Sequence, residues 1–419
     1  MVLALFAGCG GGGSTFPPPF GGSAGGFVQT GGSGGTGGAS PTDPNVGAVV
    51  VDPGPQNSQY TNGLFVTVTL CEPGTSNCQT IDHLLVDTGS VGVRVLKSEL
   101  QLALPPVQDT SGSALAECLP FVDGSSWGTV NVADLQVGGE AASSLPIQVI
   151  GEQNYPIAFD CVGTAITDFQ TLGANGIFGV GVFQNDCGTD CAQPATSFQN
   201  RRLYYACSSV LSGGCQVTSV PVEQQVPNPV AAFPVDNNGV IIQLDGIPAG
   251  GAPSVSGLLV FGIGTQTNNE LGGATVFPLD TVGVYVGTAF PIGGTQYTSY
   301  LDSGSNGLFF LNSTTTHLPM CTGNLKDFYC PSSTTSLSAT VLGADGSSAN
   351  VNFSVANASR LAARNYAFSN LAGPMPGFPS GAGIPGFDWG LPFFFGRRVY
   401  TGIEGKSTPD GIVGPYFAF

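Results

Sequence analysis

The chain has 419 residues and a net charge of −17, and only 9% of its residues are charged. This length leaves room for two lobes with sizeable cores, and 64 glycines and 31 prolines favour turns and strands over long helices. Because only ten residues are basic, the chain has no clustered positive charge for a phosphate backbone, and we expect no nucleic-acid partner.

The hydrophobic pattern predicts an all-β protein. Short alternating strands bounded by Gly, Asn and Pro recur along the chain, without a long stretch of helical periodicity. Only two short helices are predicted, Ser98–Leu104 and Ser359–Arg364. His83 lies four residues before Asp87 on a predicted strand, so alternation places both on one face, with His83 at the strand surface.

The N-terminus predicts export. Residues 1–9 have the small residues before a cysteine that end a bacterial lipoprotein signal, so we expect Cys9 to carry lipid. The alternative is a chance cysteine in a glycine-rich leader. The apolar run is far too short to span a bilayer, so the membrane would be contacted only through this anchor. The residue after the lipid site is Gly10 and not the aspartate that usually retains a lipoprotein in the inner membrane. We therefore expect the protein at the outer membrane, facing either the periplasm or the cell surface. Residues 10–45 predict a flexible tether.

The cysteines predict an oxidising compartment. Eleven are present, and setting Cys9 aside leaves an even number. The predicted disulfides are Cys71–Cys78, Cys118–Cys161, Cys187–Cys191, Cys207–Cys215 and Cys321–Cys330. The third and fourth of these pairs could instead be nested, or their four cysteines could bind one zinc ion. We favour disulfides because a periplasmic site of this kind normally oxidises, and we expect no cofactor.

Two stretches far apart in the chain have the same pattern. Residues 84–90 read Leu-Leu-Val-Asp-Thr-Gly-Ser, and residues 299–305 read Ser-Tyr-Leu-Asp-Ser-Gly-Ser. In each, an apolar strand ends at an aspartate and apolar residues follow the turn. Asp87 and Asp302 lie 215 positions apart (302 minus 87). The repeat predicts a duplicated lobe that brings two carboxylates to one site.

Two neighbouring carboxylates have a chemistry that a single one lacks. At about 3 Å they cannot both ionise, so they share one proton. The charged member can activate a water while the protonated member polarises a carbonyl. The neighbouring residues are expected to turn the chain tightly, to bond across the two loops and to donate to the carboxylates. These supporting residues are Thr88, Gly89, Ser90, Ser303, Gly304 and Ser305.

From about residue 60 to the C-terminus, the chain resembles the pepsin-like aspartic peptidases, and we expect an uncharacterised bacterial lipoprotein branch of them. Besides the two aspartate motifs, the resemblance is carried by short segments similar to the family's opening hairpin, flap, catalytic-loop closures and closing strands. These are residues 62–70, 121–139, 176–181, 258–262, 390–403 and 411–414. The resemblance implies two β-lobes with a cleft between them, residues 46–230 and 231–419, and a catalytic pair of Asp87 and Asp302.

The resemblance also implies a flap that covers an extended substrate. Its expected substrate-binding residues are Phe121, Gly124, Ser125 and Trp127. The sequence departs from the family where Phe121 replaces a tyrosine, where Trp127 is bulky, and where Asp388 precedes Trp389 and Gly390 in place of an apolar residue. Two functions follow: a monomeric endopeptidase acting on peptides or unfolded proteins at acid pH, or an inactive surface protein that binds peptides or glycans in the same cleft.

Overall fold

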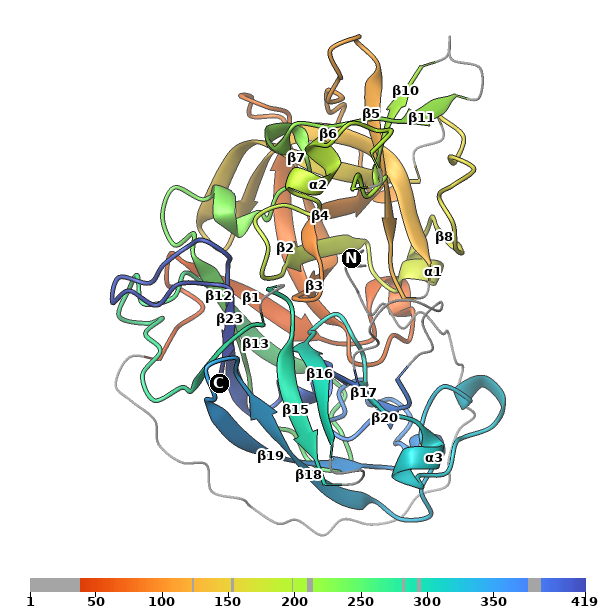
Figure 1. The fold of residues 1–419 in the computed structure, drawn as a ribbon, viewed down its shortest axis with the longest axis vertical. Helices are drawn as coiled ribbons and strands as arrows, with labels where there is room; N and C mark the ends of the chain where they lie inside the picture. The colour runs from red at the N-terminus through yellow and green to blue at the C-terminus, as the bar shows by residue number, and fades with distance from the viewer. Residues whose placement is uncertain are drawn as a thin grey trace.

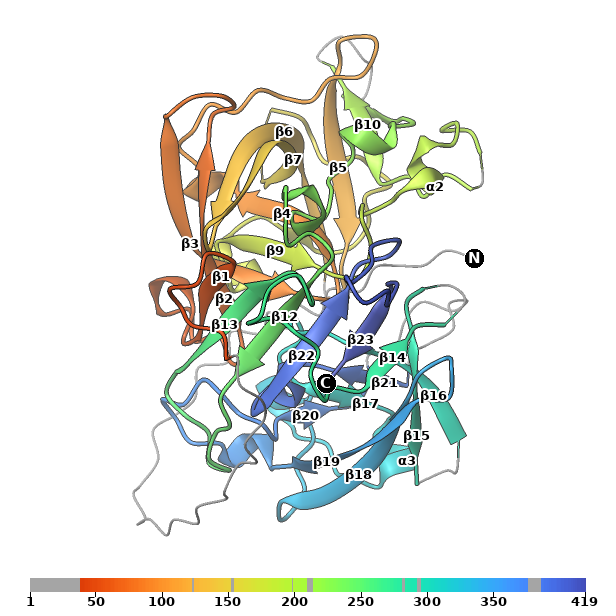
Figure 2. The ribbon, with the colours of Figure 1, turned by 90° about the vertical axis from the view of Figure 1, so that its left-hand side faces the viewer.

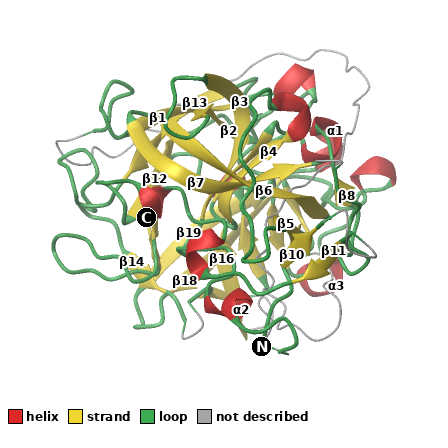
Figure 3. Ribbon diagram, turned by 90° about the horizontal axis from the view of Figure 1, so that it is seen from above, coloured by secondary structure: helices red, strands yellow, loops and turns green. Residues whose placement is uncertain are grey.

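The computed structural model describes residues 38–419, except residues 123, 152–153, 198, 209–213, 281–282, 292–294 and 376–385. Two β-lobes follow each other along the longest axis, the first half of the chain above the second (Figure 1). Helices are few and short among the strands and loops (Figure 3). The predicted all-β, bilobal architecture is confirmed. Cys9, the predicted signal and most of the predicted tether lie outside the described residues.

The first lobe is closed into a ring of strands. Within the described residues a sheet of 16 strands begins in this lobe, and β2 pairs with both β3 and β6, so that β2, β3, β9, β4, β7 and β6 close on themselves. In sheet order its strands are β11 (Cys215–Val217), β10 (Tyr204–Cys207), β5 (Ala114–Pro120), β6 (Ser125–Val137), β7 (Glu140–Ile150), β4 (Val91–Leu96), β9 (Gly176–Val180), β3 (Cys78–Asp87) and β2 (Leu64–Cys71), with β8 (Ala165–Ile166) on β6.

The same sheet continues into the second half of the chain. β1 (Val46–Val51) pairs with β2 on one side and antiparallel with β13 (Val255–Phe261) on the other, from Val46 opposite Val260 to Val51 opposite Val255. Figure 2 shows β1, β13, β12 and β22 side by side. After β13 the order is β12 (Gly239–Leu244), β22 (Arg397–Gly402), β23 (Tyr416–Ala418) and β14 (Val276–Pro278). Backbone hydrogen bonds therefore join the two halves.

A second sheet completes the second lobe. In the part of the chain that the structure describes it has seven strands. In order they are β19 (Ser348–Val355), β18 (Thr335–Leu342), β15 (Val286–Phe290), β16 (Thr295–Leu301), β21 (Phe387–Trp389), β17 (Leu308–Phe310) and β20 (Ala372–Gly373). Only β21 pairs with both β16 and β17 among these strands, and this places it beside the second aspartate motif.

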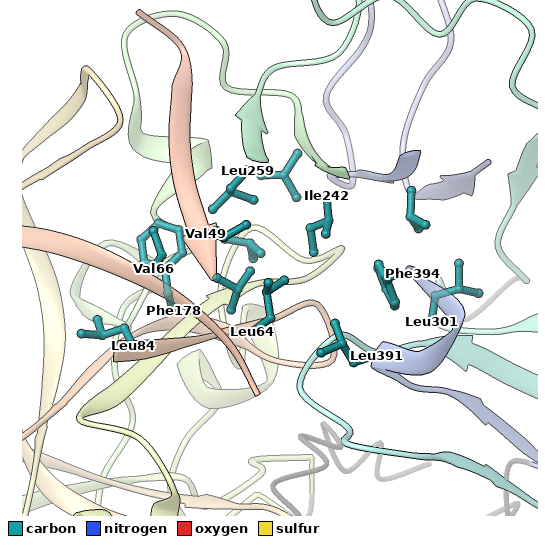
Figure 4. Packing of buried hydrophobic residues seen from close by; sticks show 14 of the residues in the cluster. Val49, Leu64, Val66, Leu84, Phe178, Ile242, Leu259, Leu301, Leu391 and Phe394 are labelled. Carbon is teal, nitrogen blue, oxygen red and sulfur yellow. The ribbon is translucent and has the colours of Figure 1, made fainter. Parts of the chain in front are cut away.

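One apolar core runs through both lobes. Buried side chains from the first lobe, the joining strands and the second lobe form one continuous cluster, part of which Figure 4 shows. The labelled examples are Val66, Leu84 and Phe178 from the first lobe, Val49, Ile242 and Leu259 from the joining strands, and Leu301, Leu391 and Phe394 from the second lobe. The burial of this apolar surface is the main force that holds the lobes together.

The helices are single turns. They are α1 (Phe169–Leu172), α2 (Thr189–Ala192) and α3 (Ser313–Thr316), and the 3-10 turns η1 (Pro55–Asn57), η2 (Lys97–Glu99), η3 (Val222–Gln224), η4 (Val230–Ala232), η5 (Gly323–Leu325), η6 (Ala358–Arg360) and η7 (Leu391–Phe393). In the described residues none of them is long and apolar enough to span a membrane.

Both predicted helices are wrong in length and type. In place of each there is only a 3-10 turn, η2 or η6, that begins one residue before the predicted helix, and the chain is extended at the residue after the turn, Leu100 or Leu361. Burial explains the first case, because Leu100, Leu102 and Leu104 are buried in alternation. That period of two suits an extended chain, not a helix.

The ten cysteines of the described residues form five disulfides: Cys71–Cys78, Cys118–Cys161, Cys187–Cys191, Cys207–Cys215 and Cys321–Cys330. The first and fourth bridges link opposite residues of antiparallel strand pairs, β2 with β3 and β10 with β11. The four cysteines considered as zinc ligands are therefore paired as two separate bridges.

Candidate active site

Each aspartate lies at the end of a strand, and a neighbouring strand pairs with both this strand and the one that follows the aspartate. β9 runs parallel to β3, with Gly179 opposite Asp87, and antiparallel to β4 on its other side. In the second lobe β21 runs parallel to β16, with Trp389 opposite Leu301, and antiparallel to β17. The repeat in the sequence is thus a repeat in the backbone. We call residues 87–90 the first aspartate loop and residues 302–305 the second.

The two loops are locked together by matching hydrogen bonds. The Thr88 backbone N–H donates to Ser303 Oγ at 3.2 Å, and the Ser303 N–H donates to Thr88 Oγ1 at 2.9 Å. Thr88 Oγ1 donates to the Leu301 carbonyl at 3.0 Å, and Ser303 Oγ donates to the Val86 carbonyl at 2.7 Å. Both hydroxyls are buried. Because every bond has a counterpart from the other lobe, the loops hold each other at fixed separation.

This lock brings two fully buried carboxyls together. Asp87 and Asp302 have no exposed surface, and each Oδ1 accepts a backbone N–H at 2.8 Å, from Gly89 and from Gly304. The loops approach so closely that a Cβ on Gly304 would lie 2.6 Å from Asp87 Oδ1, so only glycine fits there.

The surroundings of the pair favour the protonated form of Asp87. Burial raises the pKa of Asp87 well above its usual range, the charge of Asp302 and a hydrogen bond between the two carboxyls raise it further, and the bonds from Ser90 and Gly89 oppose the rise. A carboxyl that remains protonated next to an ionised one is the arrangement that general acid–base work on a carbonyl requires.

The outer oxygens of the two aspartates have different surroundings. Ser90 Oγ donates to Asp87 Oδ2 at 2.5 Å. Ser305 Oγ lies 3.0 Å from Asp302 Oδ2, but also 2.5 Å from Oδ2 of Asp388, a buried residue of β21. The site therefore contains a third carboxyl. Its only signal in the sequence is a charge inside an otherwise apolar strand, which indicated a departure from the family but no partner.

Sequence reasoning also missed an aromatic pair beside the site. Tyr300, which lies opposite Asp388 in the sheet, is buried with Tyr285, and Val122 from the β5–β6 connection packs against the two rings. Burial raises the pKa of Tyr300 well above its usual range, and the charge of Asp388 raises it further. The connection that the sequence indicated as a flap thus contacts the second lobe.

The expected substrate-binding residues of that flap lie inside the first lobe. Phe121 is buried in a cluster of first-lobe side chains, and Ser125 donates its N–H to the Thr164 carbonyl. Trp127 is buried edge-to-face against Tyr205, beside the Cys118–Cys161 bridge. A Cβ on Gly124 would lie 2.4 Å from the Thr164 carbonyl oxygen. Contact of these residues with substrate stays a prediction.

The structure has two β-lobes, and each contributes one aspartate from the end of a strand. This arrangement defines the fold class, which is that of the pepsin-like aspartic proteinases. The structure is similar to that of an aspartic proteinase from Irpex lacteus, with a TM-score of 0.52, 14% identity, and coverage of 89% of this chain and 96% of that chain. This likeness shows the fold. The sequence matches the family described as "Protein of unknown function (DUF3443)" over residues 41–419, and the chain belongs to this family. Comparison with curated proteins finds no match.

Proposed function

We propose that the protein is an aspartic endopeptidase that hydrolyses peptide bonds at acid pH. The observation that carries this proposal is the pair of buried carboxyls, Asp87 and Asp302, which interlocked loops hold together in surroundings that favour a protonated Asp87. The two supporting serines and glycines are all in hydrogen-bonding contact with the pair.

The proposed reaction conserves protons at each step. The ionised aspartate removes a proton from a water whose oxygen adds to the peptide carbonyl carbon, and the protonated aspartate gives its proton to the carbonyl oxygen. The resulting geminal diol breaks its C–N bond as a proton passes to the leaving nitrogen and the diol hydroxyl returns one to the pair. Both carboxyls must therefore be present, with one proton between them.

We further propose a peptide or unfolded protein as substrate, bound extended by β-type hydrogen bonds, to a monomeric enzyme in the bacterial envelope. Five disulfides support an exported location. The lipid anchor at Cys9 and the outer membrane stay part of the proposal. Cys9→Ser should move the protein from the membrane fraction to the soluble fraction, and equal solubility of the wild type would contradict the anchor.

An inactive binding protein is the second candidate, because Phe121 offers no hydroxyl where the pepsin-like family has a tyrosine and its side chain is buried. Such a protein would bind peptides or glycans without turnover. Phe121→Tyr separates the candidates less sharply than a direct assay does, since an active wild type needs no added hydroxyl.

The test uses denatured protein as substrate between about pH 3 and pH 7, the range in which carboxyls titrate. Asp87→Asn and Asp302→Asn should each abolish turnover, and the double variant should be hardly worse than either, because residues that act as a unit are strongly non-additive. Full activity of Asp302→Asn would refute the paired mechanism. A wild type that neither cleaves nor binds a transition-state mimic of aspartic peptidases in this range would favour the binding protein.

A further inference from the structure

Asp388 is a carboxyl buried among negative groups. It lies in β21, between the two strands that flank the second aspartate loop. The titratable groups that face it are Asp302, Asp87 and Tyr300. In the described part of the chain no ion pair includes Asp388, and its Oδ1 is buried without a hydrogen-bond partner. A charge in such a place is costly, so the neutral acid is strongly favoured.

Ser305 connects this carboxyl to the catalytic pair. Its hydroxyl lies 2.5 Å from Asp388 Oδ2 and 3.0 Å from Asp302 Oδ2, yet it carries a single proton and can donate to only one of them at a time. When Asp388 is protonated, it donates to Ser305 Oγ and leaves the hydroxyl free to donate to Asp302. When Asp388 is ionised, the charge attracts the hydroxyl and Asp302 loses this donor.

The first lobe has no such branch. Ile177 lies opposite Leu85, two residues before Asp87, just as Asp388 lies opposite Tyr300, two residues before Asp302. Ile177 is apolar and cannot accept a hydrogen bond through its side chain. The Ser90 hydroxyl therefore donates to Asp87 without competition from a second carboxyl at this position. The first half of the site thus lacks the proton-binding group that lies behind Ser305 in the second.

We propose that Asp388 is a positioning residue that stores a proton behind the catalytic pair and, through Ser305, sets how firmly Asp302 holds the shared proton. The effect on turnover rests on the proposed peptidase function. As pH rises and Asp388 gives up its proton, Asp302 loses a donor and gains a negative neighbour. Both changes strengthen its hold on the shared proton, so the working range of the pair extends to higher pH.

Asp388→Asn tests the proposal, because the amide keeps the shape, cannot ionise and can donate permanently to Ser305. The alkaline limb of the pH profile of kcat/KM should move to lower pH, by on the order of one unit. The same substitution in a Ser305→Ala background should give a smaller shift, because only the effect of the charge remains. An unmoved limb in Asp388→Asn, or an undiminished shift without the Ser305 hydroxyl, would overturn the proposal.

Infrared difference spectroscopy gives a measurement that does not need activity. A protonated carboxyl band should persist in the folded wild type at pH values where exposed carboxyls are ionised, and it should be missing in Asp388→Asn. Subtracting the spectrum of Asp388→Asn from that of the wild type separates Asp388 from Asp87, Glu140 and Asp186, whose raised pKa values also favour protonated carboxyls. If Asp388→Asn does not fold, Ser305→Ala replaces it and should shift the frequency of the band.

Asp186→Asn is the matched control, since Asp186 is buried in the first lobe with Arg94 and Tyr204, away from the pair. It should leave both the band of Asp388 and the pH limb unchanged. Absence of any band from Asp388 would overturn the proposal whatever the activity. The expected bands in a protein without turnover would leave the Asp388–Ser305 arrangement intact and refute only the peptidase function.

Discussion

At the residue scale, the site is built from small polar side chains that are buried in pairs. Thr88 and Ser303 each satisfy one backbone group of the opposite loop and one of the opposite strand. An unpaired buried polar group costs more than a paired one contributes. The lock therefore fixes the separation of the carboxyls because opening it would leave several buried groups without partners.

Ser303→Ala should destabilise the protein by about 1–3 kcal/mol, because the Val86 carbonyl loses its donor and the Thr88 N–H loses its acceptor in a buried place. Urea denaturation measures the difference. Ser336→Ala, in an exposed position of β18, is the control and should change stability by less than about 0.5 kcal/mol. Equal effects of the two substitutions would show that the lock contributes nothing to stability.

At the element scale, the β5–β6 hairpin is supported from outside by the segment that leads to β8. Cys161 of this segment is bonded to Cys118 of β5, and the Tyr155 carbonyl accepts the indole N–H of Trp127 at 3.4 Å. Ile157, Phe159 and Val162 in the same segment are exposed. The disulfide therefore holds the segment together with the burial of Ala158 and the bonds of Asp160 to Arg202 and Tyr205.

Replacing both Cys118 and Cys161 by Ser should cost about 4 kcal/mol, because this bridge closes 43 positions and the chain-entropy cost grows with loop length. The matched control removes Cys71–Cys78, which closes 7 positions, and should cost about 2.5 kcal/mol. Denaturation of the oxidised proteins compares them. A larger loss from the short bridge would contradict this ranking.

At the scale of the whole molecule, the lobes are joined by a continuous sheet, a common core and a pair of acids. Glu140 at the start of β7 is hydrogen-bonded to Asp236, which precedes β12. Asp236 also accepts hydrogen bonds from the side chains of Thr265 and Gln266. Burial raises the pKa of Glu140 from 4.5 to about 7, and the charge of Asp236 contributes to the rise.

This pair predicts a loss of stability as pH rises. The folded protein keeps the Glu140 proton up to about pH 7, whereas the unfolded chain releases it near 4.5, so stability falls across that window. Glu140→Gln cannot ionise and should show a smaller fall in melting temperature between these pH values. Glu270→Gln, at an exposed position, should follow the wild type. If the melting temperature of Glu140→Gln fell with pH as steeply as that of the wild type, the Glu140–Asp236 pair would be excluded as the cause of the fall.

Much of the site could be predicted because its signals are local. The aspartates end apolar strands, and the glycines and hydroxyl residues that follow are the ones that a tight, hydrogen-bonded turn requires. The alternation of side chains along a strand was a less reliable guide to the side on which a residue lies. His83 has a positive φ of 51° beside a bulge between β2 and β3, which interrupts the alternation, and it pairs with Asp52 at 3.2 Å.

The sequence by itself determined the strands, the repeated aspartate motifs and the close cysteine pairs, since each depends on residues near one another in the chain. Only the tertiary structure decided that β1 pairs with β13, that Trp127 is buried, and that Asp388 contacts Ser305, 83 positions away. Such contacts depend on how strands from distant parts of the chain are arranged, and neither periodicity nor composition contains that information. A charge in an apolar strand indicates that a partner is needed, but only folding shows which residue supplies it.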